Sequence, residues 1–335
     1  MSQITGSLPL TRYRLSFRVT EPLHLPAYAG STLRGAFGRA LMQLSGIGKM
    51  DIEEKNPLFL QSPYAQIFDP QRMEDENAPL NGLQQLPVPY VIEAPLCGAR
   101  VLQPDDTLVF HMVLCGPALE HLAIIILAWR RALLRGIGTG DGKGELILVE
   151  QEIAPLEWQT IYTEEHPVIQ EHQPVISIPE YTQPQDVHLH LLTPLRLQHQ
   201  GKILGPREIN ARQLLRQLIR RVSLNTQIYG GWEWPLEHIR HLNTLADQIQ
   251  EDRRLHWQEW GRYSSRQQQA MKLGGVVGRW HLRQVPQALL RLLHLGQWLH
   301  VGKETAFGLG KYEWVKEPWH PLPPRLARQE ENAHV

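Results

Sequence analysis

Alternating polar and apolar residues predict a strand near the start of the chain. From residue 11 to residue 20, polar side chains, three of them arginines, alternate with large apolar ones, which is the two-residue period of a half-buried strand. The following segment places Phe37 and Leu41 on one apolar face at helical spacing. We therefore expect a strand and then a helix, with Ser31 or Thr32 as the N-cap.

The same two patterns continue through the first half of the chain. They predict two strands, a helix and a further strand, in that order, over residues 88–94, 107–114, 117–135 and 145–150. Residues 47–86 are rich in proline and lack a clear period, so we expect a long insertion with little regular structure. The order β-α-β-β-α-β is that of a ferredoxin-like domain.

A second set of elements follows and repeats this order. The pattern predicts strands and helices over residues 187–197, 206–221, 256–262, 266–281, 286–298 and 312–315. Residues 117–149 and 286–315 share one layout, namely proline, helix, glycine loop and strand, and such repetition indicates a duplicated unit. We expect an α+β fold of two tandem ferredoxin-like (RRM-like) βαββαβ domains, with the long insertion in the first.

The expected domain limits follow from these elements. They are 1–155 for an N-terminal domain with its insertion at 47–86, 156–186 for an acidic linker, 187–317 for a C-terminal domain with a glycine-rich loop, and 318–335 for a loose tail.

Charge is unevenly distributed, although the 34 basic and 34 acidic residues cancel. Residues 145–194 contain nine acidic residues and no Lys or Arg, whereas residues 201–314 contain seventeen basic and nine acidic residues. Residues 1–46 contain five Arg and one Glu. Two basic regions thus flank an acidic middle, a distribution that the net charge hides.

Neither cysteine chemistry nor membrane insertion is indicated. Cys97 and Cys115 lack metal-ligand spacing, and we expect buried free thiols. The longest apolar run, residues 122–129, is too short to span a bilayer. We expect a cytoplasmic protein.

The most informative segment is the glycine-rich loop after the last predicted helix. Residues 302–311 hold three glycines, two lysines and Phe307. Glycine permits positive φ and close approach, and successive N–H groups in such a turn form a concavity that suits phosphate. The order helix, loop, strand is the reverse of the Walker and Rossmann phosphate loops. The alternative is a tight connection in which a glycine ends the helix.

Three segments together resemble the CRISPR-associated RAMP proteins, and among them most closely the pre-crRNA-processing endoribonucleases. They are Pro-Ala-Tyr-Ala-Gly-Ser-Thr-Leu-Arg-Gly-Ala-Phe-Gly at 26–38, Pro-Tyr-Ala at 63–65, and His-Val-Gly-Lys-Glu-Thr-Ala-Phe-Gly-Leu-Gly at 300–310. The resemblance implies two RRM-like folds, a CRISPR repeat stem-loop RNA as substrate, and metal-independent cleavage without a cofactor. Other Cas proteins would be partners. Some relatives carry a cysteine cluster in the insertion, whereas residues 47–86 here contain no Cys, so no metal site is expected there.

In the implied reaction the RNA 2′-OH attacks the adjacent phosphate and leaves a 2′,3′-cyclic phosphate and a 5′-OH. The protein must then move protons and stabilise an anionic phosphate. We predict His24 as the proton-transfer group, Tyr28 as an orienting or protonating group, and Arg34 as a phosphate clamp. The alternatives are packed His and Tyr side chains and a solvated helix face.

A larger set of residues is expected to bind RNA. It consists of Arg39, Arg212, Arg216, Arg220, Gly302, Lys303, Phe307, Gly308, Gly310 and Lys311. The three arginines from 212 to 220 recur every four residues and form one basic stripe, for which a solvated helix face is the alternative. For His300 beside the loop, we favour a cap on the helix C-terminus.

The function remains open. The chain is either the RNA-processing endonuclease or a non-catalytic RAMP subunit that uses the same surfaces as a scaffold. A nucleotide-binding enzyme that uses the glycine loop at 136–144 is a third, disfavoured hypothesis, because that loop follows a helix and precedes a strand.

Overall fold

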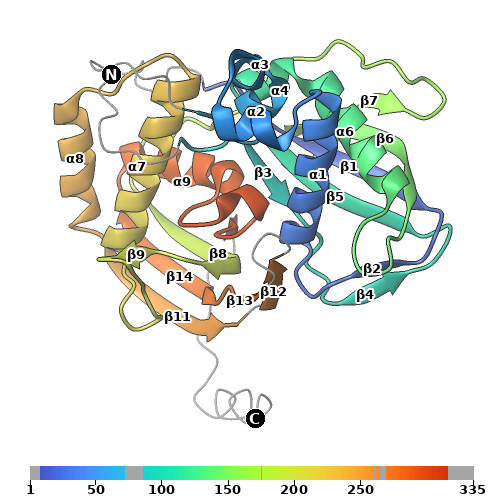
Figure 1. The fold of residues 1–335 in the computed structure, drawn as a ribbon. Coiled ribbons are helices and arrows are strands. Elements are labelled where there is room, and N and C mark those ends of the chain that lie inside the picture. The colour runs from blue at the N-terminus through green and yellow to red at the C-terminus, as the bar shows by residue number, and fades with distance from the viewer. Residues whose placement is uncertain (1–7, 72–85, 175, 260, 265–268, 316–335) are drawn as a thin grey trace, which may run out of the picture.

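The two largest sheets in the described part of the chain are antiparallel, and each half of the chain contributes one of them (Figure 1). The computed structural model describes residues 8–71, 86–174, 176–259, 261–264 and 269–315. The N-terminal sheet has the strand order β3-β5-β1-β6-β7 and the C-terminal sheet has the order β11-β14-β8-β15. The first four strands of one sheet and all four of the other follow the ferredoxin-like order, so the predicted tandem fold is confirmed.

The N-terminal sheet is built around its first strand. Its strands are β1 (Leu10–Val19), β3 (Tyr90–Glu93), β5 (Thr107–Cys115), β6 (Gly144–Ala154) and β7 (Glu157–Thr163). The two helices α1 (Gly30–Leu44) and α6 (Leu122–Arg135) cover one face. Phe37 and Trp129 stack there with their ring centroids 5.0 Å apart, because the apolar stripe of each helix meets the apolar face of β1.

The C-terminal half repeats this arrangement. Its sheet contains β8 (Gln185–Leu195), β11 (Gln250–Gln258), β14 (Gly275–Val285) and β15 (Tyr312–Val315). Its helices are α7 (Ala211–Tyr229), α8 (Leu236–Ala246) and α9 (Gln287–Leu299). Alternate residues of β8, such as Leu189 and Leu191, are buried in the core.

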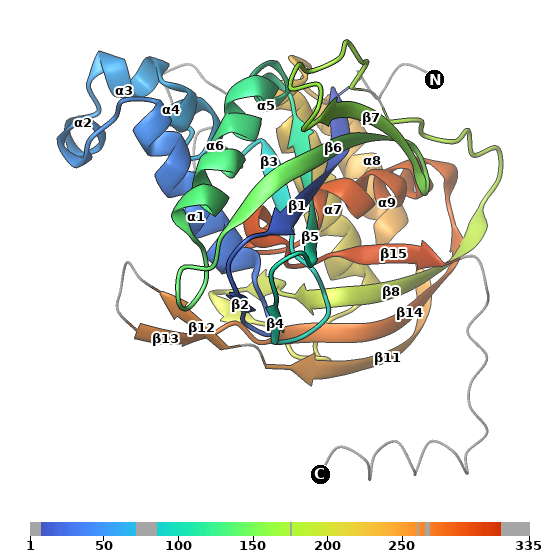
Figure 2. The same ribbon diagram turned by 90° about the vertical axis from the view of Figure 1, so that its right-hand side faces the viewer.

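Small elements complete the described chain. The short strand pairs are β2 (Leu23–Leu25) with β4 (Arg100–Leu102), β9 (Gln198–His199) with β10 (Lys202–Ile203), and β12 (Gly261–Ser264) with β13 (Gln269–Lys272). The short helices are α2 (Lys49–Glu54), α3 (Pro57–Gln61), α4 (Pro63–Ile67), α5 (Pro117–Glu120) and the 3₁₀ turn η1 (Thr305–Phe307). Figure 2 shows α2, α3 and α4 gathered at the outer end of α1.

Several local predictions are wrong. Residues 47–71 form three short helices instead of an irregular segment, because Asn56 and Ser62 each cap a helix that starts with proline. Residues 72–85 of the insertion and the predicted tail at 318–335 lie outside the described residues. The N-cap of α1 is Ala29, without a side-chain bond.

Other differences concern element limits. The helix predicted from residue 117 is divided at His121 into α5 and α6. Strand β7, within the segment expected as a linker, pairs with β6 and widens the N-terminal sheet.

Cys115 is buried, but Cys97 is exposed, so the expectation of two buried thiols holds only for Cys115.

Candidate functional site

The glycine-rich loop lies between the two halves of the protein, against the start of α1. The Tyr28 hydroxyl donates a hydrogen bond to the Phe307 carbonyl. A Cβ on Gly30 would overlap that same carbonyl, and a Cβ on Gly308 would lie 2.6 Å from the Ile92 carbonyl oxygen. The two glycines therefore allow the backbones of the two halves to approach each other closely.

The amides in the second half of this loop are bonded within the protein, so they do not form the expected concavity of free N–H groups. The N–H groups of four consecutive residues, 307–310, donate to the carbonyls of Glu304, Thr305 and Pro194. The Lys303 amide donates to Arg196, and the Lys311 amide donates to the Thr193 hydroxyl.

The residues predicted for RNA binding in this loop differ in exposure. Phe307, Gly308 and Gly310 are buried, Gly302 and Lys311 are half-buried, and Lys303 is exposed. Their roles in RNA binding remain predictions, and Lys303 is the member whose side chain reaches solvent.

Gly310→Ala should destabilise the protein more than Gly46→Ala. Both glycines have positive φ, +70° and +67°, but a Cβ on Gly310 would overlap the Val301 carbonyl whereas a Cβ on Gly46 has no neighbour within 4 Å. Both variants place a Cβ on a backbone with positive φ, and this cost is the same in the two. The overlap at Gly310 should therefore reduce the free energy of unfolding by about 1–3 kcal/mol more in Gly310→Ala. Denaturant unfolding measures both values, and equal losses would show that the loop adjusts without cost.

A buried carboxylate on the N-terminal sheet holds both ends of the glycine-rich loop. Glu93 Oε1 lies 2.9 Å from His300 Nε2 and 3.0 Å from Arg12 Nη2, and its Oε2 lies 3.0 Å from Lys311 Nζ. His300 precedes the loop and Lys311 is its last residue. Burial alone would raise the pKa of Glu93, but Arg12, Lys311 and the bond from His300 hold it well below its usual value.

His300 is the C-cap of α9, as expected, and its backbone N–H donates to the Gly296 carbonyl, but its imidazole serves the loop. It is fully buried, its Nδ1 lies 3.2 Å from the Leu309 carbonyl oxygen, and burial lowers its pKa. The imidazole joins the loop to Glu93 instead of bonding the last carbonyls of α9.

A second carboxylate continues this network. Glu152 lies 3.0 Å from Arg12 Nη1 and accepts a 2.7 Å hydrogen bond from Trp298 Nε1. Arg12 also donates to the Gln297 carbonyl at 2.9 Å and stacks on the Trp298 ring. The charged part of the joint between the two halves thus contains Arg12, Glu93 and Glu152 from one half and His300, Lys311 and Trp298 from the other.

His24 lies apart from this network, on the short strand β2. Its side chain is exposed, and its backbone forms a bridge with Thr139. A Cβ on Gly138 would overlap the His24 carbonyl, and one on Gly142 would overlap the Pro22 carbonyl. The glycine loop at 136–144 therefore packs against β2, and its glycines serve that close contact.

The remaining predicted catalytic residues are packed. Tyr28 is buried, and burial raises the pKa of its hydroxyl. Arg34 is half-buried with its guanidinium 4.2 Å from the centroid of the Phe68 ring. Arg39, one turn further along α1, is exposed. His24 is exposed on β2, whereas Tyr28 bonds to Phe307 of the glycine-rich loop and Arg34 packs against Phe68.

The basic stripe on α7 is partly neutralised. Asp247, the C-cap of α8, lies 3.0 Å from Arg212 Nε and 2.9 Å from Arg216 Nη2. Arg220 is exposed. The sequence pattern did not predict α8, because only Leu242 and Ala246 of that helix are buried, and so the neutralising carboxylate could not be foreseen.

The described residues offer neither a metal-binding cluster nor a membrane-spanning helix. No three His, Cys, Asp or Glu side chains there are placed to hold a metal ion. His188 stacks on His281 with ring centroids 4.2 Å apart. No helix in the same part of the chain has the length and apolar character needed to cross a bilayer.

Each half of the chain matches a protein-family model. Residues 189–312 match the family model of the CRISPR-associated endoribonuclease Cas6, and residues 8–174 match a family described as an N-terminal domain. A search of curated proteins finds no match.

Three solved structures share the fold. A Cas6 product complex has a TM-score of 0.53 at 17% identity and covers 92% of this chain and 100% of its own. Thermus thermophilus Cas6 has a TM-score of 0.50 at 16% identity, over 92% and 99%. A partial Cas6-RT-Cas1–Cas2 complex has a TM-score of 0.51 at 15% identity, over 93% of this chain and 47% of its own. A Cas6 family domain thus spans residues 189–312 and the chain as a whole has the tandem fold of solved Cas6 structures, so the protein is similar to the CRISPR-associated RAMP proteins that process pre-crRNA.

Proposed function

We propose that the protein is a metal-independent endoribonuclease that binds a CRISPR repeat stem-loop and cuts it once. The 2′-oxygen forms a bond to the adjacent phosphorus while the bond from phosphorus to the 5′-oxygen breaks. A base takes the 2′-OH proton and an acid protonates the leaving 5′-oxygen. The Cas6 family model over the C-terminal half supports this class of reaction.

The observation that carries the choice of residue is the exposure of His24. A proton-transfer group must reach the reacting oxygens directly. Tyr28 is buried with its hydroxyl bonded to the Phe307 carbonyl, and His300 is enclosed by Glu93 and the Leu309 carbonyl. Of these three side chains, only that of His24 meets solvent. We therefore assign proton transfer to His24 and a positioning role to Tyr28.

Exposed cations would hold the RNA backbone. Lys303, Arg39 and Arg220 all reach solvent, and phosphate contacts of this kind position a nucleic acid without reading its sequence. Arg212 and Arg216 would first have to exchange Asp247 for a phosphate. Arg34 is stacked on Phe68, so it would contribute to RNA binding indirectly, by holding α1 in place.

The non-catalytic alternative is favoured by one observation, namely that two of the three predicted catalytic side chains are engaged in packing. Purified protein incubated with end-labelled repeat RNA in EDTA separates the two functions. We expect a single cut at a defined position. Binding without a cut, both with EDTA and with added Mg²⁺, would support the scaffold function. A cut only with Mg²⁺ would overturn metal independence, and a lack of binding would overturn both functions.

A further inference from the structure

The first strand of each half leads into a short segment with a polar residue between two leucines. In the N-terminal half this segment is Leu-His-Leu at 23–25, and in the C-terminal half it is Leu-Arg-Leu at 195–197. All four leucines are buried, whereas His24 is exposed and Arg196 is half-buried. The duplicated unit therefore holds a polar side chain at the same place in both of its copies.

A glycine loop packs closely against each of these two residues. The loop at 136–144 joins α6 to β6, and a Cβ on its Gly138 would overlap the His24 carbonyl. The loop at 302–311 joins α9 to β15, and a Cβ on its Gly302 would lie 2.7 Å from the Arg196 carbonyl oxygen. Both glycines have positive φ, +76° and +93°, so the two loops approach their triplets with the same backbone geometry.

The residue after each glycine continues the correspondence. Thr139 forms an antiparallel bridge with His24, and the Lys303 amide donates a 3.0 Å hydrogen bond to the Arg196 carbonyl. In the C-terminal copy, Arg196 is thus the structural counterpart of the residue to which we assign proton transfer.

The side chain of Arg196 is held by backbone groups. Its Nη1 donates to the Gly274 carbonyl, and a Cβ on Gly275 would lie 3.0 Å from the Arg196 Cγ. Its Nε is buried without a hydrogen-bond partner, and the ion pairs of the described residues do not include Arg196. A guanidinium that is positioned and has no carboxylate partner is suited to bind phosphate oxygens.

A second cation lies beside Arg196. Lys303 is exposed, and its amide bond to the Arg196 carbonyl keeps the two residues adjacent. The acidic neighbour is Glu304. Burial raises the pKa of the Tyr28 hydroxyl, and the charges of Glu93 and Glu304 add to this effect, so Glu304 acts on the Tyr28 side of the loop. Two positive charges and one negative charge leave this end of the loop with a net charge of +1, which attracts phosphate.

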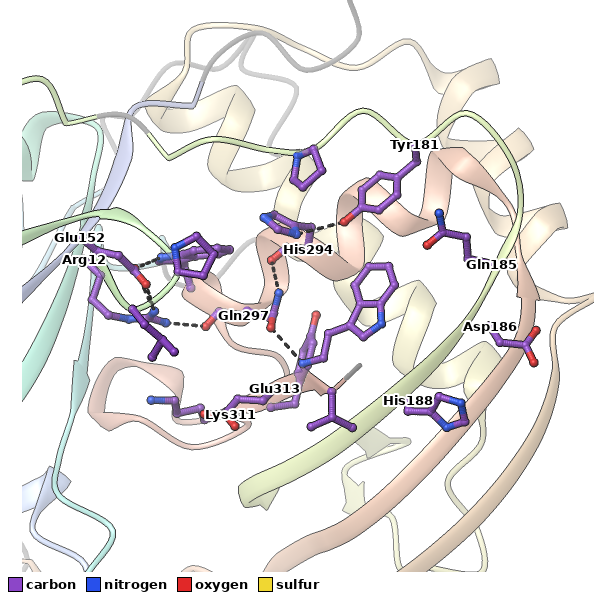
Figure 3. Close-up of a pocket in the computed structure, with 17 residues that line it drawn as sticks. Arg12, Glu152, Tyr181, Gln185, Asp186, His188, His294, Gln297, Lys311 and Glu313 are labelled. Atoms are coloured by element: carbon purple, nitrogen blue, oxygen red, sulfur yellow. Dashed lines mark hydrogen bonds and ion pairs between the residues drawn. The ribbon is translucent and has the colours of Figure 1, made fainter. Parts of the chain in front are cut away.

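The cations at the other end of the glycine-rich loop are already neutralised. Lys311 Nζ lies 3.0 Å from Glu93 Oε2, and Arg12 is paired with both Glu93 and Glu152. Figure 3 shows the Arg12–Glu152 pair beside a pocket of about 640 Å³ that Lys311 also lines. Arg12 and Lys311 are the Lys and Arg residues among its described lining residues, so this pocket has no unpaired cation to offer to RNA.

The Arg196 site adjoins the segment that carries the proposed proton-transfer group. Leu273 precedes the glycine whose carbonyl Arg196 bonds, and it packs with Tyr28 in a small buried cluster. Tyr28 lies four residues after His24. An RNA strand that crosses the joint would therefore meet His24 in one half and Arg196 in the other.

We propose that Arg196, together with Lys303, binds a backbone phosphate of the RNA and holds the strand while His24 transfers a proton at the cut. The two copies of the unit then have different uses, since the first presents a proton-transfer group and the second presents a cation that positions the backbone. This inference rests on the RNA-processing function proposed above.

Binding of repeat RNA to the full chain at several salt concentrations tests the site. The RNA carries a 2′-deoxy nucleotide at the cleavage position, and Arg196→Met removes the charge but keeps most of the apolar stem. We expect Kd to rise about tenfold, and the slope of log Kd against log salt to fall by about 0.7–1, the loss of one phosphate contact. Arg196→Lys should recover most of the slope, because it restores the charge.

Arg240→Met is the matched control. It makes the same change at an exposed residue of α8 and should leave Kd within about twofold of wild type and the slope unchanged, as for a surface change. Equal affinity of wild type and Arg196→Met would overturn the proposal. Weaker binding with an unchanged salt slope would also overturn it, because that result indicates a purely structural role.

Cleavage kinetics separate this inference from the proposed reaction. The loss in Arg196→Met should fall on KM, about tenfold, and not on kcat, because a contact to the bound strand is made equally before and during the cut. If the wild type does not cut, the proposed reaction fails, while the affinity and salt slope still decide whether Arg196 binds phosphate. If denaturant unfolding shows that Arg196→Met does not fold, Lys303→Met at the exposed neighbour replaces it, and a wild-type salt slope there would overturn the site.

Discussion

His24→Ala is expected to lower the rate of RNA cleavage by about 10²–10⁴-fold, the usual contribution of a positioned acid or base. The affinity for RNA should change little, because in our proposal phosphate contacts from Lys303, Arg39 and Arg220 supply most of it. Single-turnover cleavage of labelled repeat RNA measures the rate, and filter binding measures the affinity. The side chain is exposed, so its loss should not disturb the fold.

His166→Ala is the matched control for this prediction. His166 is another exposed histidine, in the segment that follows β7, and its removal should leave the rate within about twofold of wild type, the usual small effect of a surface change. A wild-type rate in His24→Ala would overturn the assignment of His24. A parallel loss of RNA binding would instead indicate that His24 contacts RNA without transferring a proton.

Glu93→Ala is expected to reduce the free energy of unfolding by about 3–5 kcal/mol, the typical cost of removing one partner from a buried ion pair. The variant leaves Arg12 and Lys311 without this carboxylate at the joint, and both ends of the glycine-rich loop lose their link to β3. Denaturant unfolding measures the loss. Glu145→Ala is the control, because its pair with Arg18 is exposed on both sides and should contribute about 0–1 kcal/mol. Equal losses in the two variants would contradict the anchoring role of Glu93.

The same carboxylate should give the protein a characteristic acid sensitivity. The folded-state pKa of Glu93 lies below its unfolded value of about 4.3, so its contribution to stability is complete above that value and is lost as pH falls through the folded pKa. His300 adds to this trend, because burial lowers its pKa and the unfolded chain takes up a proton below about pH 6.5 that the folded chain does not.

Glu93→Gln should therefore show a smaller loss of stability than wild type between about pH 5 and pH 3. Thermal unfolding of both proteins over this range measures the slopes. Parallel curves would mean that Glu93 does not carry the acid-sensitive part of the stability.

The fold could be predicted because it depends on local periodicity. The alternation in β1 and the apolar stripes of α1, α6 and α9 each specify an element and its buried face, and the repeated order of elements specifies the ferredoxin-like pairing. Short helices in the insertion were missed, because the start of each depends on one polar residue, Asp51, Asn56 or Ser62, and not on a repeating pattern.

The candidate site was harder to predict, because its chemistry depends on contacts between distant residues. Glu93 ends an otherwise apolar strand, and that single carboxylate was the only sequence signal for the buried network. The loop amides looked available in the sequence, yet β8 and the residue after it accept three of them. The Pro194 carbonyl accepts from Gly310, the Arg196 carbonyl from Lys303 and the Thr193 hydroxyl from Lys311. Which arginines are neutralised depends likewise on distant acidic residues, such as Asp247 for α7.

The chemistry of the cut tests the proposed function most directly. Repeat RNA would be prepared with a single 2′-deoxy nucleotide at the mapped cleavage position and incubated with the protein in EDTA. We predict that this RNA is bound as tightly as the all-ribose RNA but is not cut, while the all-ribose RNA yields a 2′,3′-cyclic phosphate and a 5′-OH. A cut at the same position in the deoxy-substituted RNA would contradict attack by the 2′-OH.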